Sequence, residues 1–75
     1  MRNEKEVKAI KQSFPVGSVI KLLCMREENN PVPAGTKGVV TGVDDIGTIH
    51  MAWENGRSLG LIVGEDDFIL VERGG

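Results

Sequence analysis

The side chains that could carry covalent or metal chemistry are few in this sequence. His50 is the only histidine and Cys24 the only cysteine, and they lie far apart in the chain. Nucleophilic catalysis combines a serine, cysteine or threonine with a base and an orienting acid, and a structural zinc ion takes four Cys or His ligands. We therefore predict no catalytic residues, no metal or other cofactor, and no enzymatic activity.

Two acidic clusters are the next candidates for chemistry. Asp44-Asp45 and Glu65-Asp66-Asp67 carry carboxylates that calcium could use. Neither cluster has the alternating ligand spacing of an EF-hand loop, and no glycine-rich loop is followed by the Lys-Ser or Lys-Thr of a phosphate site. We interpret both clusters as solvated acidic turns.

The charge of the chain is unevenly distributed. The net charge is −2; residues 1–14 contain four basic and two acidic side chains, whereas residues 15–75 contain five basic and nine acidic ones. Proteins that bind the phosphate backbone depend on clustered lysine and arginine. The acidic balance of residues 15–75 therefore argues against nucleic acid as the first choice of partner.

The cysteine content and the hydropathy pattern bear on location. One cysteine cannot form an internal disulfide, and no apolar stretch has the length of a signal peptide or of a membrane-spanning helix. We predict a cytoplasmic protein without a membrane partner.

Residues 1–14 are predicted to form a short amphipathic helix. Val7, Ile10 and Phe14 follow the i, i+3, i+7 spacing of one helical face, Asn3 is a suitable N-cap, and Pro15 ends the helix. A helix this short is marginal alone, so its apolar face needs a surface to cover. We expect it to pack on the rest of its own chain or on a second copy, which leaves a monomer and a helix-mediated homodimer open.

Residues 15–73 are predicted to form one small β domain. Five runs of β-branched and aliphatic residues, 18–25, 37–43, 48–53, 58–62 and 68–72, are separated by turn residues. Asn55-Gly56 predicts a tight type I′ hairpin turn between the third and fourth strands. A five-stranded SH3-like open barrel, in which the last strand returns to the first, hides most strand edges. The predicted fold is therefore mainly β with one short N-terminal helix.

Alternation along the strands predicts which side chains form the core. Cys24 is predicted to share the inward face as a buried or half-buried filler, and His50 falls on the outer face of its strand. The remaining inward positions are Ile20, Leu22, Val40, Ile49, Met51, Trp53, Leu59, Leu61 and Phe68.

Several segments resemble known families. The spacing of Gly35, Gly38, Val40 and Val43 resembles a KOW-type strand and turn. The segments 14–17, 33–47, 53–59 and 64–66 together closely resemble the uncharacterised family called domain of unknown function 4314, over nearly the whole chain. That family is seen mostly in Gram-positive bacteria, their phages and integrative elements. That family has no accepted catalytic residues, so the resemblance implies none in this chain.

The first functional hypothesis is a non-catalytic protein-interaction module of a phage or mobile element. A long loop and the acidic turns form the predicted surface, which would engage a basic partner protein. Its residues are Asn29, Asn30, Pro31, Pro33, Asp44, Asp45, Glu65, Asp66 and Asp67.

The alternative hypothesis is a KOW-like nucleic-acid-binding barrel. It requires the basic side chains to lie on one face, where they would contact phosphates. Those side chains are Lys5, Lys8, Lys11, Lys21, Lys37 and Arg57.

Overall fold

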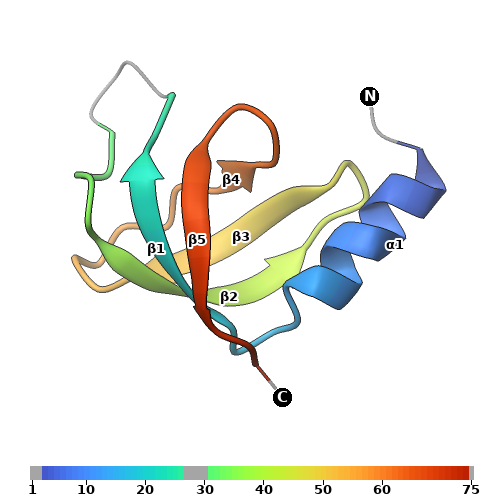
Figure 1. The fold of residues 1–75 in the computed structure, drawn as a ribbon, viewed down its shortest axis with the longest axis horizontal. Helices are drawn as coiled ribbons and strands as arrows, with labels where there is room; N and C mark the ends of the chain where they lie inside the picture. Colours follow the sequence, from blue (N-terminus) through green and yellow to red (C-terminus); the bar gives the residue numbers. More distant parts are fainter. Residues whose placement is uncertain (1–2, 27–30, 75) are drawn as a thin grey trace.

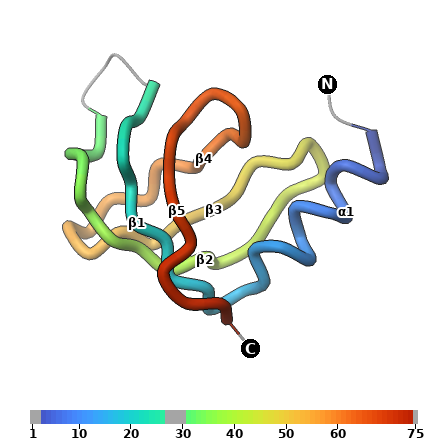
Figure 2. Tube along the Cα trace, in the orientation of Figure 1, coloured from blue at the N-terminus to red at the C-terminus, as the bar shows by residue number. Residues whose placement is uncertain are grey.

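The computed structural model describes residues 3–26 and 31–74, and within them the chain forms one helix and one antiparallel sheet (Figure 1). The sheet has five strands in the order β4-β3-β2-β1-β5, so β4 and β5 are its edges. Figure 2 shows the strands coiling around a common interior, with the first and last strands side by side. The predicted mainly β fold, an open five-stranded barrel with an N-terminal helix, is confirmed. The elements are α1 (Glu4–Ser13), β1 (Val19–Cys24), β2 (Lys37–Val43), β3 (Thr48–Trp53), β4 (Leu61–Ile62) and β5 (Asp67–Glu72).

The helix α1 is capped and docked as its sequence predicts. The side chain of Asn3 accepts a hydrogen bond of 2.9 Å from the Glu6 amide, and the helix ends at Ser13. Val7 and Ile10 are buried, and the helix packs beside β2 (Figure 1). In this structure the helix therefore covers its own barrel.

The segment after β5 fixes the end of the helix and the linker that follows it. The guanidinium of Arg73 donates to the carbonyl oxygen of Gln12 at 2.9 Å. The Ser18 hydroxyl donates to the Pro15 carbonyl at 2.6 Å and accepts from the Gly74 amide at 2.9 Å. The segment 73–74 is thus joined to the distant segment 12–18 where β1 begins.

The core is built almost entirely from the predicted side chains. Val32, which comes from the long loop between β1 and β2 and was not predicted, joins it with 2% of its surface exposed. Phe68 is partly buried against this core, and its ring contacts that of Phe14 edge-on, with centroids 5.6 Å apart. The buried members that had been predicted are Ile20, Leu22, Val40, Ile49, Met51, Trp53 and Leu61.

Cys24 is exposed, so the prediction that it fills the core is wrong. The β1–β5 pairing shifts register between Leu22 and Cys24, which leaves Leu23 as an extra residue on β1. A β-bulge of this kind breaks the strict alternation of side chains. Cys24 therefore does not return to the face that carries Ile20 and Leu22. A second shift, on β5, leaves Val71 unmatched.

The turn after β3 differs from the predicted type I′ hairpin. The amide of Gly56 donates to the Trp53 carbonyl at 2.9 Å, so Glu54 and Asn55 occupy the central positions of the turn. Gly56 follows with φ of 84°, and the Trp53 amide donates to the Arg57 carbonyl at 2.8 Å. This is a three-residue loop that ends in a left-handed glycine. The glycine at the third position favours it over a two-residue turn.

The fourth strand is shorter than the predicted range 58–62. Only Leu61 and Ile62 form a ladder with β3, opposite Ile49 and Thr48. The Leu59 carbonyl instead accepts a 2.8 Å hydrogen bond from the Trp53 indole. The buried indole needs this acceptor, and residues 58–60 form no ladder with β3.

Gly38 leaves room for the indole, and this contact yields a first prediction. A Cβ atom at Gly38 would lie 2.6 Å from Cε3 of Trp53, whereas one at Gly42 would have no neighbour within 4 Å. Gly38→Ala is expected to lower the free energy of unfolding by about 1–3 kcal/mol through overpacking. Gly42→Ala is the matched control and is expected to change it by less than about 1 kcal/mol. Equal urea midpoints for the two variants would contradict the prediction.

Candidate protein-binding surface

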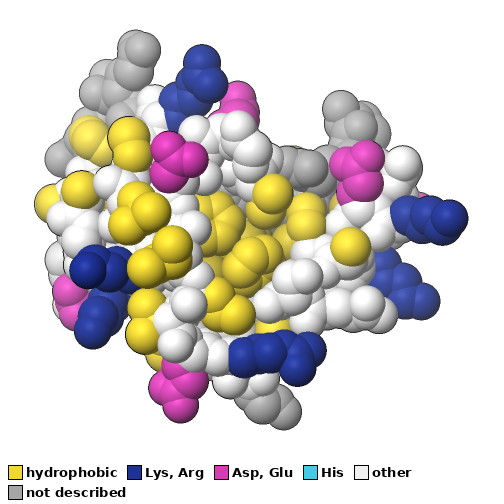
Figure 3. All heavy atoms as spheres, in the orientation of Figure 1, with side chains coloured by type: hydrophobic (Ala, Val, Ile, Leu, Met, Phe, Trp, Pro, Cys, Tyr) yellow, Lys and Arg dark blue, Asp and Glu magenta, His cyan; other side chains and the backbone are white. Residues whose placement is uncertain are grey.

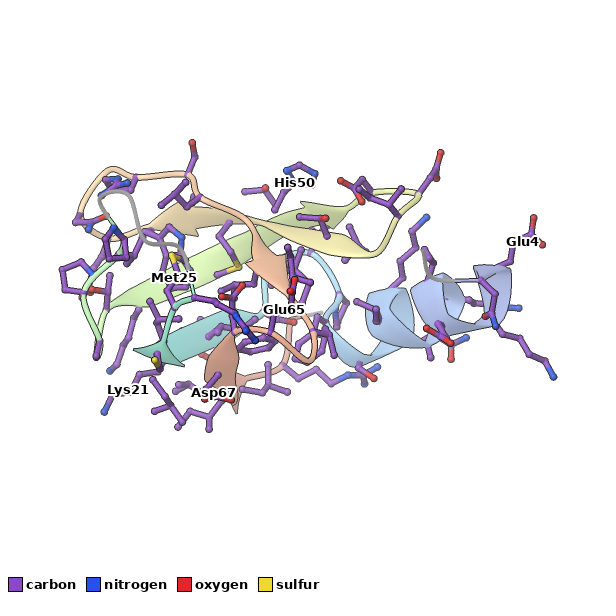
Figure 4. The ribbon with its side chains drawn as sticks, turned by 90° about the horizontal axis from the view of Figure 1, so that it is seen from above. Glu4, Lys21, Met25, His50, Glu65 and Asp67 are labelled. Atoms are coloured by element: carbon purple, nitrogen blue, oxygen red, sulfur yellow. The ribbon has the colours of Figure 1, made fainter. Side chains whose placement is uncertain are left out.

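Asp44, a predicted partner contact, is engaged inside the β2–β3 turn. One of its oxygens accepts from the amides of Ile46 at 3.1 Å and Thr48 at 2.9 Å, and the other lies 2.9 Å from Nε2 of His50. His50 projects from the outer face of β3, as predicted, and its side chain is 53% exposed (Figure 4). The carboxylate therefore fixes the turn.

These contacts set the pKa of Asp44. Partial burial raises it, but hydrogen bonds from Thr48, His50 and Ile46 and the charge of His50 lower it more, so the pKa lies below its ordinary value of 3.8. A lowered pKa in the folded state means that the ionised carboxylate stabilises the fold. This contribution to stability is fully present at a pH above the ordinary pKa of aspartate. It is lost as the pH falls through the lowered pKa of the folded state.

A pH titration of stability tests the role of Asp44. Asp44→Asn is expected to melt at a lower temperature than the wild type at neutral pH, because a neutral amide oxygen accepts the hydrogen bonds of the Ile46 and Thr48 amides less strongly than a carboxylate does. The difference is expected to shrink as the pH falls below about 4, where the carboxylate of the unfolded chain becomes protonated, and to disappear below the lowered pKa of the folded state. Thermal melts followed by circular dichroism at several pH values measure this. A difference that stays constant down to the lowest pH is the contrary result.

Asp66 is engaged in a similar way at the turn before β5. Its carboxylate accepts from the Arg26 amide at 2.8 Å and from the Ile62 amide at 2.9 Å. This brings the 63–67 turn beside the start of the long loop. Pro31 and Pro33, both exposed, flank the buried Val32 in that loop, and Asn29 and Asn30 lie outside the described residues.

The acidic turns do not form one surface. Asp45 is exposed and lines a recess with Glu4, Val7, Lys8 and Lys11 of α1. Glu65 and Asp67 are exposed at the other turn, between β4 and β5, and Figure 4 shows Asp67 well away from α1. The structure thus brings the loop and the 65–67 turn together and leaves Asp44 and Asp45 elsewhere.

The basic residues are divided in the same way. Lys5, Lys8 and Lys11 are exposed on α1, while Arg57 follows the turn after β3. Lys21 on β1 and Lys37 on β2 are direct neighbours across the antiparallel ladder. The structure thus divides these residues between α1, where Lys8 and Lys11 line one recess, the turn after β3, and the Lys21–Lys37 pair on the sheet.

The outward side of β5, β1 and β2 carries exposed apolar side chains around a pair of lysines. Ile69, Lys21 and Lys37 form one row across the three strands, and Val19, Val39 and Ala52 form the next. Leu23 is 46% exposed, Val39 41% and Ile69 47%. Hydrophobic side chains gather over β1 and β5, and basic ones lie beside them at the left of Figure 3. We call this surface the outer patch: Val19, Lys21, Leu23, Lys37, Val39 and Ile69.

A family model places the chain among known sequences. The model described as "Domain of unknown function (DUF4314)" matches residues 3–71. The chain belongs to the DUF4314 family. No curated protein and no solved structure matches it. The predicted family is confirmed, and the match extends from the cap of α1 to β5.

Metal and membrane features are absent from the residues that the structure describes in this DUF4314 chain. Across 3–26 and 31–74, no three His, Cys, Asp or Glu side chains are grouped so that they could hold a metal ion. Among the same residues, no helix is long and apolar enough to cross a bilayer.

Lys21 and Lys37 are the least expected members of the outer patch. Like charges directly opposite each other on a sheet destabilise it. No carboxylate in the described part of the chain forms an ion pair with either lysine. The sequence does not reveal this pairing, because sixteen positions separate the two residues and only the β1–β2 register makes them neighbours.

The repulsion between the two lysines can be measured as a stability effect. Lys21→Gln and Lys37→Gln are each expected to raise the free energy of unfolding by about 0.2–1 kcal/mol, because each removes the repulsion. The double variant is expected to gain less than the sum of the two, because the repulsion can be removed only once. Urea unfolding at low salt gives all three values. Strict additivity would mean that the lysines do not repel each other.

Proposed function

We propose that this DUF4314 chain is a non-catalytic protein-interaction module, and that it serves a phage or mobile element as an accessory protein in the bacterial cytoplasm. The outer patch is the observation that carries the proposal. Large aliphatic side chains on three neighbouring strands remain 41–47% exposed there. Exposed apolar surface of this kind marks binding sites on small proteins.

The position of the patch strengthens the argument. The outward face of an antiparallel sheet is normally polar where it meets water. Here Val19, Val39 and Ala52 line a shallow hollow that ends at Lys37 and Glu54. A partner side chain can enter this hollow and remove apolar surface from water, which is the main favourable term in protein association.

A nucleic-acid-binding barrel is the second candidate, and the Lys21–Lys37 pair is what favours it. The charges around the pair weigh against it. Glu54, Asp67 and Glu72 are all exposed, and Glu72 is paired directly with Val19. A phosphate backbone laid over the two lysines would meet these carboxylates.

The interaction proposal is tested by comparing capture by variants. The wild-type protein and Val39→Ser/Ile69→Ser are immobilised, and the proteins each retains from a Gram-positive lysate are quantified by mass spectrometry. The double variant is expected to lose the captured partner at least about tenfold. The matched control is Ile46→Ser, which removes an even more exposed aliphatic side chain (59%) at the β2–β3 turn. It is expected to capture as the wild type does.

Two results would contradict the proposal. The first is a set of captured proteins that is the same for the wild type and the outer-patch variant. The second is retardation of a short DNA duplex or single strand in a low-salt gel shift that Lys21→Glu/Lys37→Glu abolishes. That result would support the nucleic-acid alternative instead.

A further inference from the structure

We infer that the partner of the outer patch is a protein segment that places a carboxylate between Lys21 and Lys37 and aliphatic side chains on either side of it. This inference rests on the proposed function, since it names the chemistry of the partner that the same surface binds. It differs from the sequence-based prediction, which expected acidic turns to engage a basic partner.

The layout of the patch gives the pattern of the segment. Lys21 lies between Ile69 on β5 and Lys37 on β2 in one row of the sheet. Apolar surface adjoins this row on both sides. Val19, Val39 and the hollow that they line lie on one side, and Leu23 lies on the other. A matching segment has an acidic residue at its centre and aliphatic neighbours.

The electrostatics of the lysine pair explains why the centre is acidic. Both ammonium groups are donors, and an ionised carboxylate has two oxygens that accept. One aspartate or glutamate can therefore receive hydrogen bonds from both lysines, and such charge-assisted bonds are strong. Its negative charge also offsets the repulsion that the free protein carries. The pair that destabilises the free sheet thus favours the bound state.

The surrounding acids indicate a protein segment rather than a polyanion. Glu54 follows the end of β3, and Asp67 and Glu72 lie at the two ends of β5. A duplex presents a phosphate about every 1.7 Å of its axis and could not reach the lysines without approaching these acids. An isolated carboxylate in an apolar segment avoids them. The chemistry therefore points to an acidic and aliphatic peptide.

A peptide selection tests the inference. The wild-type protein is panned against a phage-displayed library of short random peptides, and enriched peptides are synthesised with a fluorescent label. We expect Asp or Glu flanked by Val, Ile or Leu. By fluorescence polarisation, Lys21→Glu/Lys37→Glu is expected to bind them at least about tenfold more weakly. The matched control is Lys5→Glu/Lys8→Glu, which reverses the charge of two lysines on the helix. It is expected to change the affinity by less than about twofold.

A charge swap completes the test. Replacing the central acid of the peptide by lysine is expected to abolish binding to the wild type and to restore binding to Lys21→Glu/Lys37→Glu. Lys37→Glu alone is included because Lys37 is exposed whereas Lys21 is partly buried. It is expected to keep the fold and to give an intermediate affinity.

The outcomes separate this inference from the proposed function. Enriched peptides that lose affinity for Val39→Ser/Ile69→Ser but not for the lysine variants would overturn the acidic segment and leave the interaction module intact. A selection that yields no lysine-dependent peptide also overturns the inference. Tighter binding of a short DNA duplex than of any peptide at the same two lysines would overturn both.

Discussion

The pairing of β1 with strands on both of its sides is the constraint on which the rest of the structure depends. β1 forms ladders with β2 and with β5, which brings residues near the two ends of the chain together. Such long-range pairing costs loop-closure entropy that local contacts do not recover. The burial of Ile20 and Leu22 on the inner side of β1, both with no exposed surface, offsets that cost. The same strand presents Val19, Lys21 and Leu23 outward, so one element supports both the core and the outer patch.

The sequence predicted those features of the fold that depend on local pattern. The ranges of β2 and β3 and the cap at Asn3 agree with the structure, because strand alternation and helix capping are encoded within a few residues. The failures arise from contacts that strand alternation does not encode. Cys24 left the core because a bulge in the β1–β5 ladder changed the alternation. The fourth strand is shorter than predicted, and the Leu59 carbonyl accepts a hydrogen bond from the Trp53 indole instead of pairing with β3.

The candidate site was predictable in composition but not in arrangement. Lys21 and Lys37 were recognised as basic residues, yet only the strand register makes them a pair. Asp44 and Asp66 were recognised as acids, yet their carboxylates are committed to backbone amides of the turns that contain them or lie beside them. An aspartate can either carry a free charge at the surface or accept hydrogen bonds from the backbone amides of a turn. The sequence alone does not distinguish these two roles, because the fold decides which amides lie near the carboxylate.

The open edge of β5 affects how copies of the protein behave at high concentration. Residues 68–71 are all apolar, and Ile69, Leu70 and Val71 remain 40–49% exposed on a strand with an unpaired side. A run of this kind can seed fibrils. It is bounded by Asp67 and Glu72, and the bulge at Val71 interrupts the strand. Flanking charges and bulges are the devices by which natural sheets resist edge-to-edge growth. The strand that completes the barrel therefore carries its own protection against aggregation.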